Sequence, residues 1–345
     1  MLKRLDKGKR STRARKSPRA KRADRLRKGD ASLKPDIDFF LIGAAKCGTT
    51  SVYRTFSRHP DIYVPPIKEP RFLCGSNLKK GWRWYARNWK KQPAGTITGD
   101  FSPSYSVSLS ASAPAPRRIA QHYPNAKIIY VVRDPVAAAI SNWRMATAKS
   151  KEGLSFAEAV RAWPSVGQRM KFWSQISLYR KYFPDSQIRV IVVEEITRNP
   201  ARMREIFKWL GVRSEGRDIP RFATANKSSA RINRPPRPSI PTEDRQWFLA
   251  QMKDEARAIL DYAGVRRSVW KLTTRSKAWM SEKELAAQKE RQNKIRKGLA
   301  WIVPAPVQRF VQRTVKPAQH LKCLVLVRAP RKLARLVGIK TEPRR

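Results

Sequence analysis

The sequence predicts an α/β protein with three layers, in which helices flank a central parallel sheet. Apolar segments of strand length alternate with segments of helical pattern, and such alternation produces parallel sheets with right-handed crossovers. About 230 residues lie between two strongly basic ends, which is enough to bury a sizeable core. The expected strands are residues 38–43, 96–99, 127–132 and 187–193, and the expected helices are residues 49–58, 115–122, 135–149, 155–182, 200–210 and 242–263.

The first strand and helix enclose a candidate phosphate-binding loop. Residues 39–51 read Phe-Phe-Leu-Ile-Gly-Ala-Ala-Lys-Cys-Gly-Thr-Thr-Ser, an apolar run followed by small residues and a helix start. This order aims backbone N–H groups and the positive end of a helix dipole at an anion. The alternative is an ordinary strand-turn-helix corner that binds nothing. The residues expected to bind phosphate are Lys46, Cys47, Gly48, Thr49, Thr50 and Ser51.

The position of the lysine separates this loop from those that hydrolyse nucleoside triphosphates. Their pattern is G-x-x-x-x-G-K-[ST], with the lysine directly after the second glycine. Here Gly43 and Gly48 keep the glycine spacing, but Thr49 follows Gly48 and the lysine stands earlier, at Lys46. A lysine inside the loop can neutralise a bridging or leaving phosphate oxygen. The order therefore argues against an ATPase or a GTPase.

A second candidate phosphate site follows the strand expected at 127–132. Arg133 comes directly after this strand, at the edge where open α/β sheets bind ligands, and a guanidinium group suits a phosphate. Pro135 is well placed to begin a helix. Ser141 lies about two helical turns beyond Arg133, so its hydroxyl can approach the same phosphate. The alternative for Arg133 is a structural ion pair with Asp134 or another carboxylate.

These two segments resemble those of a known enzyme family. The order K-x-G-T-T-S at residues 46–51 resembles the 5′-phosphosulfate loop of sulfotransferases that use 3′-phosphoadenosine 5′-phosphosulfate (PAPS), and residues 122–143 resemble their 3′-phosphate-binding segment. The resemblance covers roughly residues 37–264 and points to the branch that acts on heparan sulfate and other carbohydrates. It implies a P-loop-like fold, PAPS as donor and adenosine 3′,5′-bisphosphate as product. No metal is implied, because the lysine does the neutralising.

The same resemblance assigns the acceptor side. Residues 59–73 look like the family's acceptor-side segment, in which a glutamate after a lysine is the general base; here that is Glu69. A carboxylate within hydrogen-bond reach can take the acceptor's proton as the S–O or S–N bond forms. The alternative is a surface ion pair between Lys68 and Glu69. The acceptor group is a hydroxyl or an amine; the resemblance favours a carbohydrate, and the sequence leaves an oligosaccharide, a lipid-linked glycan and a small metabolite open.

Three further segments match the family less closely. Residues 99–105 resemble its G-E-x-[ST]-P-x-Y segment, which lines the acceptor cleft, but Phe101 stands where some members that modify glycosaminoglycans have a lysine. Residues 188–211 resemble the next strand-helix unit and are given a structural role. Residues 226–231 occupy the place of the basic loop that closes over the 3′-phosphate, which makes Lys227 a candidate for donor binding.

The charge distribution suggests basic extensions at both ends. The chain holds 75 Lys and Arg against 26 Asp and Glu, for a net charge of +49. We expect residues 1–34 to form a disordered basic tail, residues 35–264 the catalytic domain, and residues 265–345 a basic helical extension. Short apolar patches between basic residues in 299–339 suit contact with an anionic membrane surface. Docking on the protein's own domain or on a partner subunit explains these patches equally well.

Composition also bears on location and on rival functions. The sequence shows neither a cleavable signal nor a membrane span, so we expect a cytoplasmic enzyme, which is peripheral to a membrane if residues 299–339 contact one. Three cysteines and three histidines indicate neither a disulfide framework nor a zinc site. A nucleotide kinase or NTPase would need a lysine after Gly48. A nucleic-acid-binding protein would explain the basic tails but not the two phosphate segments.

Overall fold

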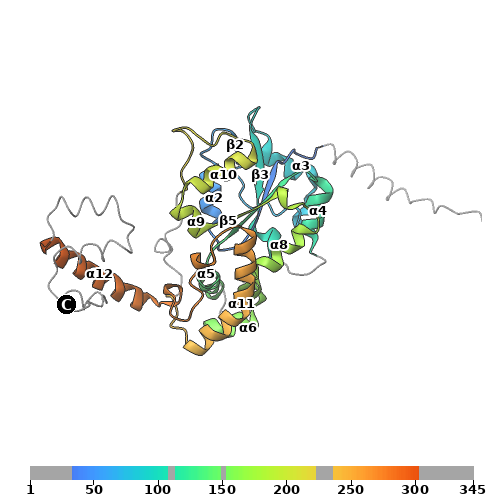
Figure 1. Cartoon of the computed structure of the whole chain (residues 1–345). Helices are drawn as coiled ribbons and strands as arrows, with labels where there is room; N and C mark the ends of the chain where they lie inside the picture. Colours follow the sequence, from blue (N-terminus) through green and yellow to red (C-terminus); the bar gives the residue numbers. More distant parts are fainter. Residues whose placement is uncertain (1–32, 108–112, 149–152, 223–235, 303–345) are drawn as a thin grey trace, which may run out of the picture. The chain divides into compact units, whose positions relative to one another are not determined.

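The computed structural model describes residues 33–107, 113–148, 153–222 and 236–302. Five strands, each parallel to its neighbours, form one sheet in the order β2-β3-β1-β4-β5 (Figure 1). This arrangement confirms the predicted three-layer α/β fold. The strands are β1 (Phe39–Gly43), β2 (Ile62–Tyr63), β3 (Ile97–Phe101), β4 (Lys127–Val132) and β5 (Ile188–Val192).

Helices cover both faces of the sheet because side chains alternate along each strand. Phe39 and Leu41 of β1 point to one face, where they share a core with α2 and α10. Phe40 and Ile42 point to the other face, where the core includes α4, α5, α8 and α11. The helices are α2 (Thr49–Phe56), α3 (Gly81–Ala86), α4 (Pro114–His122), α5 (Pro135–Thr147), α6 (Phe156–Ala162), α7 (Pro164–Gly167), α8 (Phe172–Arg180), α9 (Val193–Arg198), α10 (Ala201–Leu210), α11 (Thr242–Tyr262) and α12 (Glu282–Ile302).

The single helix expected at 155–182 is instead three helices. A capping box between Ser155 and Glu158 begins α6, and α6 ends before a proline at position 164, which has no amide hydrogen to continue it. Lys171 then takes a non-helical conformation, with ψ at 70°, directly before α8. The sequence analysis also missed β2, α3 and α9, which are too short for a periodic pattern to identify them.

The chain divides into two compact units. The first comprises residues 1–236 and 240–279, and the second comprises residues 237–239 and 280–345. The first unit extends beyond residue 264, where the sequence analysis placed the end of the domain, because Val269, Trp270 and Trp279 are buried in its core. In the second unit the structure describes α12, which begins with a capping box between Ser281 and Glu284.

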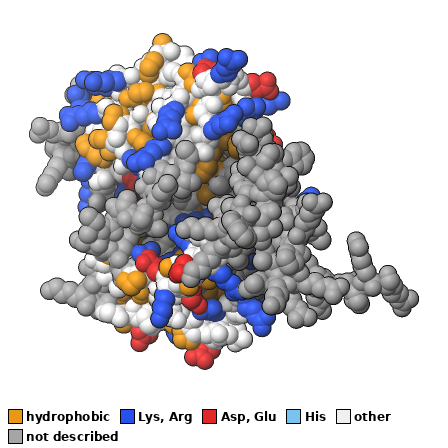
Figure 2. Space-filling model, turned by 90° about the vertical axis from the view of Figure 1, so that its left-hand side faces the viewer, with side chains coloured by type: hydrophobic (Ala, Val, Ile, Leu, Met, Phe, Trp, Pro, Cys, Tyr) orange, Lys and Arg blue, Asp and Glu red, His pale blue; other side chains and the backbone are white. Residues whose placement is uncertain are grey.

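Several expectations about the ends of the chain concern residues that are not described, namely 1–32 and 303–345, so the predicted basic tail and most of the predicted membrane-contact segment lie outside the described residues. Within the described ranges, no helix is both long and apolar enough to cross a bilayer. Figure 2 shows Lys and Arg side chains spread over one face of the described surface, with Asp and Glu in smaller groups. Positive charge is therefore not confined to the two ends.

One glycine of the sheet has a clear packing role. A Cβ atom at Gly99 would lie 2.2–2.5 Å from three ring carbons of Phe39, which is fully buried on the neighbouring strand. We expect Gly99→Ala to lower the free energy of unfolding by about 1–3 kcal/mol, the usual cost of overpacking a core. Urea denaturation would measure this loss. Gly153→Ala is the control, since no atom lies within 4 Å of the corresponding Cβ position and its stability should be unchanged.

Candidate functional site

The predicted phosphate loop lies at the carboxyl edge of the sheet, between β1 and α2. Gly48 caps α2 in the left-handed conformation, with φ at 84°, and no acidic residue stands in the first turn of the helix. The first N–H groups of a helix have no partner within it, so the start of α2 attracts an anion. Thr49 and Ser51 are buried in this turn, and Thr50 is partly exposed. The local order expected from residues 39–51 is therefore present.

Cys47 has a structural side chain within this loop. Its thiol is completely buried in the core, and burial raises its pKa to about 12 despite the nearby Arg133 and Lys46. The thiol therefore stays protonated at neutral pH and cannot act as a nucleophile. Any contribution of Cys47 to anion binding would come from its backbone.

Arg133 and Ser141 lie on the neighbouring strand-helix unit. β4 pairs with β1 in parallel, so Arg133, which follows β4, emerges beside the phosphate loop. One Nη atom of Arg133 donates to the carbonyl of Ala137 in α5. In an α-helix that carbonyl also accepts from the amide of residue 141, so the guanidinium lies about one turn from Ser141.

Arg133 retains capacity to bind an anion. Its Nε is buried without a hydrogen-bond partner among the described residues. Asp134, the partner considered in the ion-pair alternative, instead caps α5 by accepting from the amide of Ala137 at 3.0 Å. A buried donor without a partner is costly, and an anionic ligand would satisfy it.

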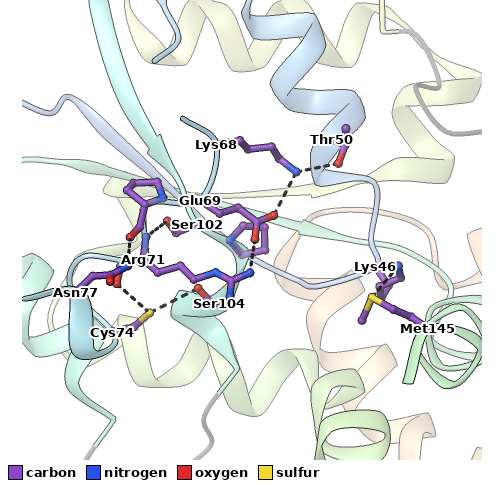
Figure 3. Close-up of polar contacts among 12 residues, drawn as sticks. Lys46, Thr50, Lys68, Glu69, Arg71, Cys74, Asn77, Ser102, Ser104 and Met145 are labelled. Carbon is purple, nitrogen blue, oxygen red and sulfur yellow. Dashed lines mark hydrogen bonds and ion pairs between the residues drawn. The ribbon is translucent and has the colours of Figure 1, made fainter. Parts of the chain in front are cut away.

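Glu69 lies in the loop after β2 and is joined to the phosphate loop through Lys68. The Nζ of Lys68 donates to Thr50 Oγ1 at 2.8 Å and to Glu69 Oε1 at 3.3 Å, and Arg71 Nη2 donates to Glu69 Oε2 at 2.8 Å (Figure 3). The ion pair of Lys68 and Glu69 therefore exists, but it is more than a surface pair. The two side chains are only 25% and 27% exposed, and Thr50 is a third partner.

The environment of Glu69 keeps it ionised. Burial alone would raise the pKa of Glu69, but the hydrogen bond from Arg71 and the charge of Lys68 outweigh it and hold this pKa below its ordinary value. At neutral pH the carboxylate can therefore accept a proton. The same two cations fix its orientation.

Backbone conformation singles out the same residues. Among the described residues, the non-glycine positions with positive φ are Lys46 at 67°, Glu69 at 64° and Arg71 at 52°. Non-glycine residues rarely adopt this region, and such conformations often persist at functional sites because surrounding contacts hold them. All three belong to the two loops that meet through Lys68.

Three other residues from the sequence analysis are not seen in the group around Glu69. Lys46 approaches Met145 of α5, with Nζ 3.5 Å from Sδ, and Figure 3 shows it apart from the group around Glu69. Phe101 is buried against the rings of Phe39, Tyr53 and Phe56, so its side chain faces the core and not an acceptor cleft. Lys227 lies outside the described residues.

Sequence reasoning missed the partners of Glu69. It noted Lys68 only as a possible ion-pair partner and did not consider Arg71. The spacing gave no usable signal, because both Glu69 and Arg71 adopt positive φ and strand alternation does not describe this loop. The contact of Lys68 with Thr50 had no local signal, since it joins loops that follow different strands.

Comparisons with known proteins identify the family of the chain. Residues 36–233 match the family model described as a sulfotransferase domain. Over 183 residues the chain is 32% identical to mouse heparan sulfate glucosamine 3-O-sulfotransferase 3B1, a match that spans 50% of this chain and 45% of that protein. Over 194 residues it is 29% identical to human bifunctional heparan sulfate N-deacetylase/N-sulfotransferase 3, spanning 50% of this chain and 22% of that protein. The chain thus matches less than half of the length of these relatives.

A solved structure covers more of the chain. The crystal structure of a sulfotransferase from Alicyclobacillus acidocaldarius aligns with a TM-score of 0.56 and 25% identity, over 68% of this chain and 99% of that one. The similarity therefore includes nearly all of that smaller chain.

Proposed function

Because the chain belongs to the sulfotransferase domain family, we propose that it transfers a sulfuryl group from PAPS to a hydroxyl or an amine of a carbohydrate acceptor. The observation that carries this proposal is the connection of Glu69 through Lys68 to Thr50. It brings a carboxylate suited to proton removal next to the loop suited to the donor's 5′-phosphate.

We assign the roles of the site residues from their positions. Glu69 takes the acceptor's proton while the new S–O or S–N bond forms and the bond from sulfur to the 5′-phosphate oxygen breaks. Lys46 and the first N–H groups of α2 stabilise the negative charge left on that phosphate. Arg133, with Ser141 on α5, binds the 3′-phosphate, where it would satisfy the buried Nε. In this scheme Cys47 to Ser51 line the 5′ site, and Lys227 belongs to the 3′ site.

The surroundings of Glu69 support an acidic acceptor. Residues 70–99, which lead from Glu69 through α3 to β3, contain seven Lys and Arg and no Asp or Glu. Such a segment attracts polyanions at long range. The named relatives act on heparan sulfate, one as a 3-O-sulfotransferase and another as an N-deacetylase/N-sulfotransferase. We therefore propose a carboxylated or sulfated carbohydrate as acceptor, with either a hydroxyl or an amine as the accepting group.

Donor binding is the simplest test of this function. A ligand that binds only the native state raises the melting temperature according to its affinity. We expect adenosine 3′,5′-bisphosphate to stabilise the protein more than ATP does at equal concentration. A preference for ATP, or no shift with either nucleotide, would contradict the proposed donor.

Arg133→Ala should weaken bisphosphate binding about 10- to 100-fold, since a hydrogen bond to a charged group contributes about 1.5–3 kcal/mol. Isothermal titration calorimetry would measure this change. Arg180→Ala is the matched control, because Arg180 is a surface arginine paired with Asp185, which lies just before β5, at the amino ends of the strands and away from Arg133. Equal affinities in the two variants would remove Arg133 from the donor site.

A further inference from the structure

Asp100 is a fully buried carboxylate that the mechanism above does not use. It lies on β3, where Oδ1 accepts from Ser102 Oγ at 2.6 Å, and Oδ2 accepts from Tyr105 at 2.6 Å and from Tyr85 at 2.7 Å. Each of these hydroxyls has one proton and uses it on Asp100. Their remaining lone pairs can then only accept hydrogen bonds.

Two of these hydroxyls accept from the backbone of the loop that carries Glu69. The amide of Arg71 donates to Ser102 Oγ at 3.0 Å, and the amide of Leu73 donates to the hydroxyl of Tyr105 at 3.3 Å. Figure 3 shows Ser102 beside the backbone of Arg71. Because Asp100 takes the protons, both hydroxyls are held in the orientation that accepts these amides.

The loop needs such support. Glu69 and Arg71 both have positive φ, a conformation that costs roughly 1–2 kcal/mol for a residue with a Cβ and persists only where contacts hold it. Asn77 adds one contact by donating to the carbonyl of Pro70 at 2.8 Å. The hydroxyls of Ser102 and Tyr105, which Asp100 orients, accept from the amides of Arg71 and Leu73.

We propose that Asp100 is a positioning residue for Glu69, acting through Ser102 and Tyr105 on the backbone of residues 71–73. Held in this way, Arg71 directs its guanidinium to Glu69 Oε2, which orients the base beside Thr50. Asp100 itself has no access to an acceptor, because it is completely buried and both its oxygens are occupied. This inference rests on the proposed role of Glu69 as the base.

A merely structural role for the network makes different predictions. If Asp100 only stabilises the core, losing one of its partners should lower stability and leave the properties of Glu69 unchanged. If it positions Glu69, the loss should change turnover and the pH profile while donor binding persists. The readouts must therefore separate kcat, the acid limb of the pH profile and bisphosphate affinity.

The test compares Ser102→Ala with Thr98→Val in the full chain. Ser102→Ala removes the link to Arg71 and leaves Asp100 with two tyrosine donors. Thr98→Val removes an equally buried hydroxyl from β3, the strand that Ser102 directly follows; this hydroxyl bonds to Trp89 and to the carbonyl of Tyr63 and not to the loop. Both variants should lose similar stability, which makes Thr98→Val the matched control.

We expect Ser102→Ala to lower kcat about 10-fold or more, since small misplacements of catalytic groups are costly. Its acid limb should move to higher pH, because Glu69 loses part of the hydrogen bonding that lowers its pKa. Bisphosphate affinity should stay within about 2-fold. Thr98→Val should leave kcat and the pH profile as in the wild type. Asp100→Asn, if it folds, should follow Ser102→Ala; equal behaviour of Ser102→Ala and Thr98→Val would overturn the proposal.

Amide hydrogen exchange separates this inference from the proposed function. In Ser102→Ala the amide of Arg71 should exchange faster than in the wild type, whether or not the protein transfers sulfuryl groups. A wild-type protein without transfer activity would refute the proposed function, and exchange would still report on the loop. Unchanged exchange at Arg71 would refute the positioning role even in an active enzyme.

Discussion

Lys46→Ala should lower kcat for sulfuryl transfer by about 10²–10³-fold, the usual cost of removing one preorganised group that stabilises developing charge. Lys46 lies inside the phosphate loop with a left-handed backbone, and in the proposed mechanism its charge stabilises the 5′-phosphate oxygen that the breaking bond to sulfur leaves. The loss should fall on kcat much more than on bisphosphate affinity, because the α2 amides and Arg133 remain. Steady-state kinetics with PAPS and calorimetry with the bisphosphate would measure both quantities.

The appropriate control is a lysine at the amino ends of the strands, away from the phosphate loop, which lies at their carboxyl ends. Lys127 begins β4, and its Nζ donates to the carbonyl of Trp209 at 2.6 Å, so Lys127→Ala removes a positive charge from the same strand pair without touching the phosphate loop. This control should retain nearly full turnover. Comparable kcat values in Lys46→Ala and Lys127→Ala would remove Lys46 from the mechanism.

Glu69→Gln should lower kcat by about 10²–10⁴-fold, because an amide cannot take the acceptor's proton. In the wild type the pKa of Glu69 is held below its ordinary value of 4.5, so activity should rise with pH through this low pKa as the carboxylate forms and then level off. Glu69→Gln should lack that acid limb. Bisphosphate binding should persist, since Glu69 is a partner of the loop's cations and not a donor ligand.

A glutamate outside the candidate site provides the comparison for this variant, and its side chain is as exposed as that of Glu69, at 27%. Glu195 on α9 forms an ion pair with Arg202 at 3.8 Å, and Glu195→Gln should change neither kcat nor the pH profile. If Glu69→Gln turned over as fast as Glu195→Gln, another group would have to remove the proton.

Local patterns predicted the backbone of the two candidate phosphate segments. The loop between β1 and α2, and the position of Arg133 after β4, follow from neighbouring residues: an apolar strand, a glycine turn and a proline that begins a helix. The parallel sheet then places the carboxyl ends of these strands at one edge. These parts of the site needed no knowledge of distant contacts.

The acceptor side depends on contacts between segments far apart in sequence. Lys68 donates to Thr50, and the amide of Arg71 donates to Ser102. Both contacts depend on the tertiary structure, including the pairing of β2 with β3, and not on a local pattern. Phe101 was associated with the acceptor cleft because residues 99–105 resemble the family's segment that lines it, whereas β3 continues to Phe101 and the ring is buried. With the correct strand end, side-chain alternation would have put Asp100 and Phe101 on opposite faces.

Transfer of ³⁵S from labelled PAPS to a partly desulfated heparin-type acceptor tests the central claim most directly. The mechanism predicts that wild-type protein places label in the carbohydrate and releases an equal amount of adenosine 3′,5′-bisphosphate. Lys46→Ala and Glu69→Gln should do neither at a comparable rate. If folded wild-type protein leaves PAPS unconsumed across hydroxyl and amine carbohydrate acceptors, the chain does not carry out the reaction proposed for it.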